Sequence, residues 1–350
     1  MTTDASAPDP AGRWAGVRAA VVGTGLIGGS VLLRLRAAGL DVAGWDPDPA
    51  TRRHARRQGV EAPETLDEAV AGRRVVLLCG PLPTLADTLL RVARAAPPDC
   101  VLTDVGSTKA ELAAFATRHG LVDRFVPGHP MAGADSAGLT SATAALLDSA
   151  AWVLCPSDGP ATAAFRWLAA LVVDVFRARV VPMSPQEHDE AAALASHVPH
   201  LLAGALAGAA RHAALRDAVL ALAAGSFRDG TRVAGTPAAR TASMLLGNRD
   251  RVLDGLAGVT AFLDRLAGAL RAGDAASLTA LYAEAEATRS ALLARPFDTS
   301  VRVFPAGGDH AAEVAWLRRL GAGGGHLSAC RVAAGTVSYT AHAPAGTAPA

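Results

Sequence analysis

The sequence carries almost no net charge. It has 33 basic and 32 acidic residues, a formal net charge of +1, and no long run of one sign. Nucleic acids and anionic membrane surfaces are bound by cationic faces, so the sequence gives no reason to expect either partner. Lysine, isoleucine and asparagine occur once each, as Lys109, Ile27 and Asn248. Alanine, arginine, glycine and proline are abundant, which is typical of GC-rich coding sequences and carries no functional information.

Paired cysteines and a leader segment are also missing. Cys79, Cys100, Cys155 and Cys330 are scattered without a C-x-x-C spacing, which favours free thiols in a reducing compartment. Residues 1–16 contain no basic or apolar leader region, so we expect a disordered tail rather than a signal peptide. These absences together predict a cytoplasmic protein.

One apolar stretch, residues 191–210, tests the expectation that no segment spans a membrane. It contains His197, Pro199 and His200, and it is rich in alanine and glycine rather than leucine. Buried helix packing explains these features better than a membrane span does.

A glycine-rich turn organises the N-terminal half of the chain. Residues 19–22 predict a buried parallel strand, and a helical pattern begins at Leu26 and Ile27. Between them Gly23, Gly25 and Gly28 form a G-x-G-x-x-G pattern, which is typical of a dinucleotide-binding turn. These five residues are therefore predicted to bind the pyrophosphate of a cofactor.

An acidic residue follows at the distance that this fold requires. The next predicted strand ends at Asp46, where the carboxylate would bind the adenosine ribose and repel a 2′-phosphate, so we expect NAD rather than NADP. Arg52 and Arg53 lie close by and leave NADP open, although a solvated helix face explains them more simply. Gly80, after the third strand, is expected at the same cofactor-binding edge.

Strands and helices alternate from residue 17 to 182, which predicts an α/β Rossmann-type doubly wound parallel sheet. From 183 to 296 only helical patterns remain, several of them apolar nearly all round, so we expect an all-α domain that forms a homodimer. Residues 297–342 predict a β-α-β-β segment, and 343–350 a disordered tail. The strands expected in the parallel sheet are residues 19–22, 41–45, 74–79, 100–105, 124–127, 151–155 and 179–182.

Five short motifs occur in one order along the chain. They are GLIGGS (25–30), DVGSTK (104–109), GHPMAG (128–133), HD…SHVPH (188–200) and FRDGTRVAG (227–235). In this order and spacing the chain resembles the prephenate/arogenate dehydrogenase family of tyrosine biosynthesis, over about residues 18–295. The resemblance implies a hydride transfer from C4 of a cyclohexadiene to NAD, loss of the hydroxyl proton, and departure of CO₂ as the ring becomes aromatic.

The resemblance also implies roles for particular residues. His129 matches the family's catalytic histidine and would accept the hydroxyl proton. Ser107 matches a serine that binds the same hydroxyl or orients that histidine. Arg232 matches an arginine that holds a substrate carboxylate. His200 matches a histidine at the entrance of the substrate site, with His197 nearby.

Other interpretations of these residues stay open. His129 could be a loop histidine held by backbone, Ser107 a helix cap, and Arg232 one more surface arginine. His197 and His200 could be buried structural histidines, with Pro199 interrupting their helix.

The chain departs from the family at a few positions. Asp135 stands where many members have glutamate, so a substrate-site role for it is expected but with a shorter reach. His188 and Asp189 could orient the site or cap a helix. A metal site from His188, His197 and His200 fits no standard spacing, so no metal is expected. Residues 297–342 are at best an incomplete ACT-like segment.

Several functions stay open at this point. Prephenate and arogenate differ in a side chain that no motif here distinguishes, and 4-amino-4-deoxyprephenate is a third candidate substrate. β-Hydroxyacid dehydrogenases use a lysine in the interdomain helix, whereas the single lysine here, Lys109, lies in the nucleotide-binding region. A non-catalytic NAD-binding sensor would not need His129, Ser107 and Arg232.

Overall fold

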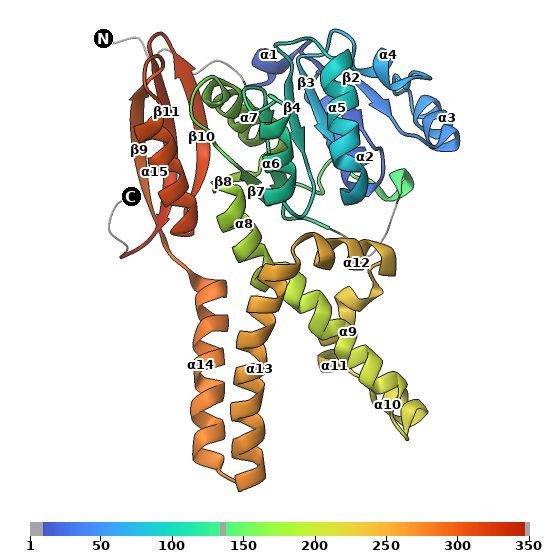
Figure 1. Cartoon of the computed structure of the whole chain (residues 1–350), viewed down its shortest axis with the longest axis vertical. Coiled ribbons are helices and arrows are strands. Elements are labelled where there is room, and N and C mark those ends of the chain that lie inside the picture. The colour runs from blue at the N-terminus through green and yellow to red at the C-terminus, as the bar shows by residue number, and fades with distance from the viewer. Residues whose placement is uncertain (1–9, 134–137, 347–350) are drawn as a thin grey trace. The chain divides into compact units, whose positions relative to one another are not determined.

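The computed structural model describes residues 10–133 and 138–346, and its elements are labelled in Figure 1. The chain divides into two compact units. The first unit contains the chain up to His188 together with residues 299–343, and the second contains residues 189–298 and the short stretch that begins at Pro344.

The first unit contains a five-stranded parallel sheet in the order β2-β1-β3-β4-β5. This confirms the predicted Rossmann-type fold. β1 and β3 are neighbours from which the chain proceeds in opposite directions, which makes their carboxyl ends the switch point where such sheets bind ligands. The strands are Arg18–Val22 (β1), Asp41–Trp45 (β2), Val75–Leu78 (β3), Val101–Asp104 (β4) and Phe125–Val126 (β5).

Helices cover both faces of this sheet because alternate strand residues are apolar on each side. Val21 and Leu77 pack in one buried cluster with α2 and α7, and Val22 and Leu78 pack in another with α4, α5 and α6. The helical segments are Leu26–Ala37 (α2), Pro49–Arg57 (α3), Leu66–Val70 (α4), Leu82–Thr84 (η1), Leu85–Ala95 (α5), Ala110–Arg118 (α6), Leu139–Ser141 (η2) and Ala161–Phe176 (α7).

The last two predicted strands do not join the parallel sheet. They belong to a second sheet of the same unit, ordered β6-β7-β8-β10-β11-β9. β6 is antiparallel to β7, and it follows β5 after one residue, so the chain passes from one sheet to the other there. The strands are Gly128–Pro130 (β6), Ala151–Leu154 (β7), Arg179–Pro182 (β8), Phe297–Pro305 (β9), His326–Ala333 (β10) and Thr336–Pro344 (β11).

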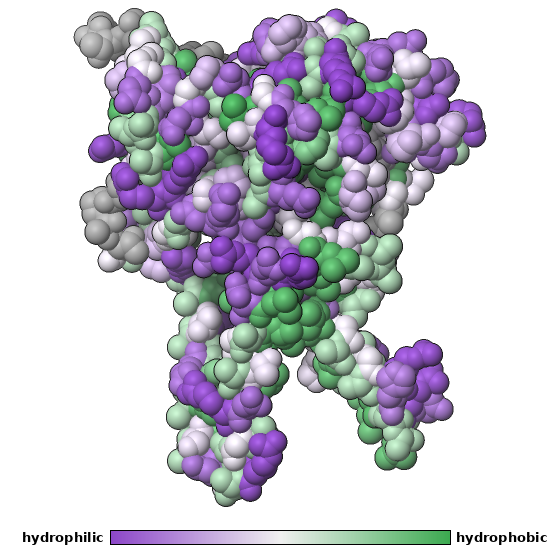
Figure 2. Space-filling view, viewed as in Figure 1, coloured by the Kyte–Doolittle hydropathy of each residue, from purple (hydrophilic) through white to green (hydrophobic). Residues whose placement is uncertain are grey.

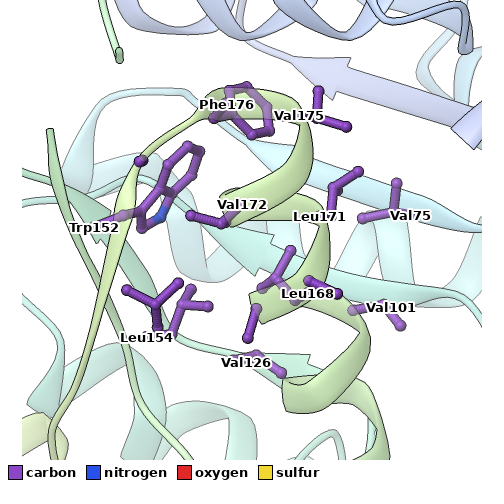
Figure 3. Packing of buried hydrophobic residues seen from close by; sticks show 14 of the residues in the cluster. Val75, Val101, Val126, Trp152, Leu154, Leu168, Leu171, Val172, Val175 and Phe176 are labelled. Atoms are coloured by element: carbon purple, nitrogen blue, oxygen red, sulfur yellow. The ribbon is translucent and has the colours of Figure 1, made fainter. Parts of the chain in front are cut away.

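Helix α7 joins the two sheets in one core. Figure 3 shows Leu168 and Leu171 of α7 near Val101 of the parallel sheet, and Trp152 of β7 beside Phe176. The Trp152 and Phe176 rings pack edge to face with centroids 4.8 Å apart. Since these side chains are fully buried, the second sheet is held rigidly against the first.

The C-terminal segment, which we expected as a short, incomplete ACT-like segment, is part of the first unit. The β-α-β-β order is present, with helix α15 (Ala311–Ala322) after β9, but Leu327 of β10 pairs with Val180 of β8 and so continues the second sheet. The final strand also takes in residues 343–344, which we had assigned to a disordered tail.

A buried polar network fixes this segment to α7. Nε of Arg166 donates to Glu313 at 2.9 Å, and Nη1 donates to the Ala306 carbonyl at 2.8 Å. The Tyr339 hydroxyl donates to the same carboxylate, and burial raises the pKa of that hydroxyl, so it remains a donor.

The expected N-terminal tail is partly structured. Residues 1–9 lie outside the described residues, but Pro10–Trp14 form helix α1. Trp14 is buried, and its indole N–H donates to Asp174 at 3.1 Å. The indole also packs edge-on against Trp167, so α1 is anchored to α7.

The second unit is built from helices. Helix α8 (Pro185–Ala192), whose residues up to His188 belong to the first unit, runs through a π-helical turn (Ala193–His197, η3) into α9 (Val198–Arg211). Pro199, which we expected to interrupt the helix, is the second residue of α9 and directly follows the π-helical turn, and the helix continues through it. The remaining helical segments are Arg216–Leu222 (α10), Gly225–Thr231 (α11), Arg232–Gly235 (η4), Ala238–Gly247 (α12), Arg249–Ala272 (α13) and Ala275–Ala294 (α14).

Residues 185–211 are the one stretch of the described chain that is long and apolar enough to cross a membrane. It carries three polar side chains that are almost fully buried in the protein, namely His188, Asp189 and His197. These buried polar groups argue against a membrane span. Only 28% of the apolar window is buried inside the protein, however, so the buried helix packing that we expected applies to a minor part of it.

Large apolar side chains of the second unit remain exposed. Leu222 is 82% exposed, Leu215 72% and Leu246 71%, and Figure 2 shows hydrophobic residues gathered over the helices of this unit. Soluble chains rarely leave so many such residues in water, so this surface needs a covering partner.

The Arg166–Glu313 contact predicts that the C-terminal segment stabilises the whole first unit. Glu313→Gln should lower the free energy of unfolding by about 3–5 kcal/mol, because it leaves a buried guanidinium without its counterion. Thermal and urea unfolding would measure this. Glu284→Gln breaks an exposed pair with Arg265 and serves as the control, with a change below about 1 kcal/mol. Equal effects of the two substitutions would contradict the assignment.

Candidate active site

The glycine turn lies at the switch point of the parallel sheet. Gly23 follows β1 with φ +94°, a conformation that side chains other than glycine rarely adopt. A Cβ at Gly23 would lie 2.7 Å from the backbone nitrogen of Gly80, and one at Gly28 would lie 1.9 Å from the Gly23 carbonyl oxygen. These two glycines are therefore required by packing between β1, β3 and α2.

Gly25 is different from the other two glycines. Within the described residues, a Cβ at this position would meet no atom closer than 4 Å. Gly25 is the N-cap of α2, where unpaired N–H groups and the helix dipole attract anions. The turn thus has the features of a dinucleotide-binding turn, because packing requires Gly23 and Gly28 and the space at Gly25 is open at the start of α2.

Asp46 follows β2 and is tied to the glycine turn. One carboxylate oxygen accepts from the backbone N–H of Thr24 at 2.9 Å, and the other accepts from that of Asp48 at 3.1 Å. Each oxygen has a second lone pair, so the carboxylate can still accept hydrogen bonds from a ribose.

We had expected Arg52 to lie on a solvated helix face, but it does not. It is 8% exposed, and its Nη1 donates to the Asp46 carbonyl at 2.7 Å while Nη2 donates to Glu64 at 3.0 Å. Its guanidinium is therefore committed to holding the loop after β2. Arg53 is exposed, as the solvated-face interpretation requires.

A buried ion pair connects the loops after β4 and β5. Lys109 Nζ contacts Asp104 Oδ2, and both side chains are fully buried. Asp104 Oδ1 accepts from the Gly128 N–H at 3.1 Å, and Lys109 Nζ donates to the Gly128 carbonyl at 2.7 Å. A Cβ at Gly128 would lie 2.9 Å from the Asp104 carbonyl oxygen. Both backbone polar groups of Gly128 are thus held by this pair, which fixes the backbone position of the next residue.

That next residue is His129, in β6. Its side chain is 9% exposed, and its Nδ1 lies 2.9 Å from Nε2 of His188 in α8. The rings meet edge to face, with centroids 5.1 Å apart and an interplanar angle of 75°. From the sequence, His188 could orient the site or cap a helix, and its contact with a residue 59 positions away is a finding of the structure.

Ser107 lies in the loop between β4 and α6 and is partly exposed. The N-cap of α6 is Lys109, so the structure does not give Ser107 the capping role that we considered. Asp135 lies outside the described residues. Gly80 follows β3, so the expected residues of the first unit all follow the carboxyl ends of its strands. Cys79 precedes Gly80, and burial raises the pKa of its thiol, which keeps it uncharged beside the turn.

The other expected residues belong to the second unit. His197 is fully buried, and its Nδ1 lies 3.1 Å from the amide nitrogen of Asn248, which also donates to the Asp189 carbonyl at 2.7 Å. His200 Nδ1 donates to the Ser196 carbonyl at 2.9 Å. Arg232 begins the 3₁₀ turn η4 and is exposed. Within the described residues, no three His, Cys, Asp or Glu side chains are grouped to hold a metal ion.

Comparison with known proteins gives two matches to family models. Residues 31–182 match the nucleotide-binding domain of prephenate dehydrogenase, and residues 184–284 match its dimerization domain. A prephenate dehydrogenase of Bacillus subtilis is 33% identical over 242 residues, 67% of this chain. The chain covers 65% of the length of that relative.

Solved structures give the same result. The arogenate dehydrogenase of Synechocystis superposes with a TM-score of 0.68 at 28% identity, over 79% of this chain and 99% of the other. A prephenate dehydrogenase of A. aeolicus, solved with hydroxyphenyl propionate and NAD⁺, has a TM-score of 0.73 at 25% identity, over 79% and 98%. These findings support NAD as the cofactor expected from the sequence.

The packing around the glycine turn predicts opposite results for two similar substitutions. Gly28→Ala should unfold the first unit at lower temperature, because its Cβ would overlap the Gly23 carbonyl. Gly25→Ala should leave the melting temperature within about 2 °C but weaken NAD binding at least about tenfold, a loss of about 1.4 kcal/mol. Calorimetric titration with NAD and thermal unfolding measure both. A Gly25→Ala protein that binds NAD normally would contradict the assignment of the turn.

Because Lys109 and Asp104 form a buried pair, we predict that a change in either the size or the charge of side chain 109 lowers the free energy of unfolding. Lys109→Met should cost about 3–5 kcal/mol of folding free energy, because the Asp104 carboxylate loses its counterion. Lys109→Arg keeps the charge but adds bulk to a closed site, and should cost about 1–3 kcal/mol. Arg265→Met, at an exposed pair, is the control for urea unfolding. A Lys109→Met protein as stable as this control would show that the pair is not needed.

Proposed function

Because this chain belongs to the prephenate dehydrogenase family, we propose that it catalyses the NAD-dependent oxidative decarboxylation of prephenate to 4-hydroxyphenylpyruvate. The observation that carries the proposal is the position of His129. It is a buried histidine that follows β5 at the carboxyl edge of the parallel sheet, where the glycine turn and Asp46 also lie. A substrate held beside a nicotinamide would need a base at that edge of the sheet.

In the proposed reaction His129 takes the proton of the 4-hydroxyl group. A neutral imidazole suits this role because histidine exchanges protons near neutral pH. Bound NAD supplies the acceptor for the hydride that leaves C4. As the C4 carbonyl forms, the ring carboxylate departs as CO₂, and its bonding electrons move through the ring to the carbonyl oxygen. The product is an aromatic phenolate, which takes up a proton to become the phenol. Ser107 would donate or accept a hydrogen bond at the same hydroxyl.

Residues of the second unit are proposed to bind the rest of the substrate. The planar guanidinium of Arg232 suits a carboxylate. His200 and His197 are proposed at the substrate site, the former through Nε2 because its Nδ1 is used by the Ser196 carbonyl. Asp135 is proposed to complete the polar lining.

NAD is preferred over NADP in this proposal. The Asp46 carboxylate would repel a 2′-phosphate, and the buried Arg52 is used by Asp46, Pro47 and Glu64. Gly23, Gly25, Leu26, Ile27, Gly28, Gly80 and Ser107 would line the remaining cofactor contacts.

We also propose a cytoplasmic homodimer. The exposed leucines of the second unit provide the apolar surface that two copies would bury, and the matched family model describes this region as a dimerization domain. Nothing in the charge of the chain favours a nucleic acid or a membrane surface.

Arogenate is the second candidate substrate, because one structural relative is an arogenate dehydrogenase. It differs from prephenate in carrying an amino acid in place of a keto acid, and no described residue distinguishes the two. 4-Amino-4-deoxyprephenate, with an amine at C4, remains the third.

The proposal predicts that purified protein forms NADH from NAD and one of these three substrates. The absorbance of NADH measures the reaction. His129→Asn should lower kcat by about 10²- to 10⁴-fold, the contribution of a general base, while NAD binding is unchanged. Hydroxyphenyl propionate, which resembles the product, should inhibit. His119→Asn, at an exposed histidine of the same unit, is the matched control.

Two results would count against it. Absence of turnover with all three substrates, in protein that still binds NAD, would overturn the dehydrogenase assignment and favour an NAD-binding sensor. Full activity of the His129→Asn protein would be consistent with the proposed reaction but would show that His129 is not its base.

A further inference from the structure

His129 is contacted from a second direction by a residue that the proposed function does not use. His188 lies in α8, is 2% exposed, and places its Nε2 2.9 Å from Nδ1 of His129. An imidazole is seldom buried so completely unless its nitrogens are used. The contact joins β6 to α8 and therefore constrains the ring of His129. The Asp104–Lys109 pair, in contrast, constrains the backbone before this residue.

The first turn of α8 is built to hold His188 in place. The Ser184 hydroxyl accepts from the Glu187 N–H at 3.2 Å, and the Glu187 carboxylate accepts from the Ser184 N–H at 2.9 Å, which is a complete capping box. The His188 N–H then donates to the Ser184 carbonyl at 3.0 Å. His188 thus sits at a helix start whose position is fixed by its own hydrogen bonds.

The geometry limits the protonation states of the two rings. Two imidazole nitrogens 2.9 Å apart form a hydrogen bond only if one carries a proton and the other a lone pair. A base that takes a proton through Nε2 must begin with that nitrogen unprotonated. The neutral His129 must then carry its proton on Nδ1, and His188 Nε2 must be the acceptor.

We propose that His188 is a positioning residue that fixes His129 in the tautomer with a proton on Nδ1 and a lone pair on Nε2. This inference rests on the proposed function of His129 as a base. When Nε2 of His129 takes the hydroxyl proton, the Nδ1–H···Nε2 bond becomes charge-assisted and stabilises the new imidazolium. His188 itself neither contacts the reacting atoms nor gains the proton.

The position of the acceptor suggests how to test this. The side-chain amide of glutamine can present an oxygen near the position of a histidine Nε2, whereas leucine fills similar space without an acceptor. His188→Leu should lower kcat about 10- to 100-fold, less than loss of the base itself, with KM values for NAD and substrate within about threefold. His188→Gln should recover most of kcat. A purely structural role would predict no such rescue.

His119→Leu is the control. His119 is an exposed histidine of the same unit, at the end of α6, whose ring packs against Phe115 with centroids 4.3 Å apart. It should keep kcat within about twofold. If His188→Leu changes kcat no more than this control does, the proposal is wrong.

A spectroscopic measurement separates this proposal from the proposed function. In protein labelled with ¹⁵N-histidine and assigned with His129→Asn, the His129 ring should be the Nδ1–H tautomer, and His188→Leu should abolish that single state. If the wild-type protein shows this tautomer but turns over none of the three substrates, the dehydrogenase function is rejected and the positioning role of His188 is retained. An Nε2–H tautomer in the wild type would overturn the proposal, whether or not the variants fold.

Discussion

The buried contact of Asp104 and Lys109 with Gly128 is the interaction on which the site depends. It joins the loops after two neighbouring parallel strands, and it uses both the N–H and the carbonyl of Gly128. A fully buried ion pair is costly unless its hydrogen bonds are complete, and here the carboxylate also accepts from the Gly106 N–H at 2.9 Å. The result is that His129 starts from a backbone position that cannot drift relative to the cofactor-binding edge.

The second sheet extends this constraint across the first unit. His129 lies in its edge strand β6, opposite Val153 of β7, and β7 is followed across the sheet by β8, β10, β11 and β9. The C-terminal segment is therefore scaffold for the strand that carries His129. Its anchor, the Arg166–Glu313–Tyr339 network, joins α15 and β11 to α7 by buried hydrogen bonds.

Local patterns were enough to predict most elements. The glycine turn and the strands of the parallel sheet up to residue 127 were predicted close to their observed bounds, because buried strands have a strong local pattern. Pairing between distant strands has no such signal. Nothing in residues 151–154 or 326–333 indicates that they share a sheet, so β7 and β8 were assigned to the parallel sheet and the C-terminal segment to a separate module.

The same limit applies to the site. Asp46 and the glycines could be named because they follow predicted strands, and His129 because its GHPMAG motif resembles that of a known family. His188 and the capping box before it could not be linked to His129, since that contact depends on how α8 packs. One signal was available for Lys109: it is the single lysine in a chain with 33 basic residues. A compact ammonium fits a closed site where a guanidinium would not, which is a physical reason for an arginine-rich chain to use lysine there.

The central claim is that this edge of the sheet brings a fixed His129 to the reacting hydroxyl. The most direct test is a structure of the chain with NAD and hydroxyphenyl propionate bound. We predict that the ligand hydroxyl lies about 2.6–3.2 Å from Nε2 of His129, with Nδ1 still on His188. A hydroxyl held by another residue, with His129 Nε2 turned away from it, would contradict the account.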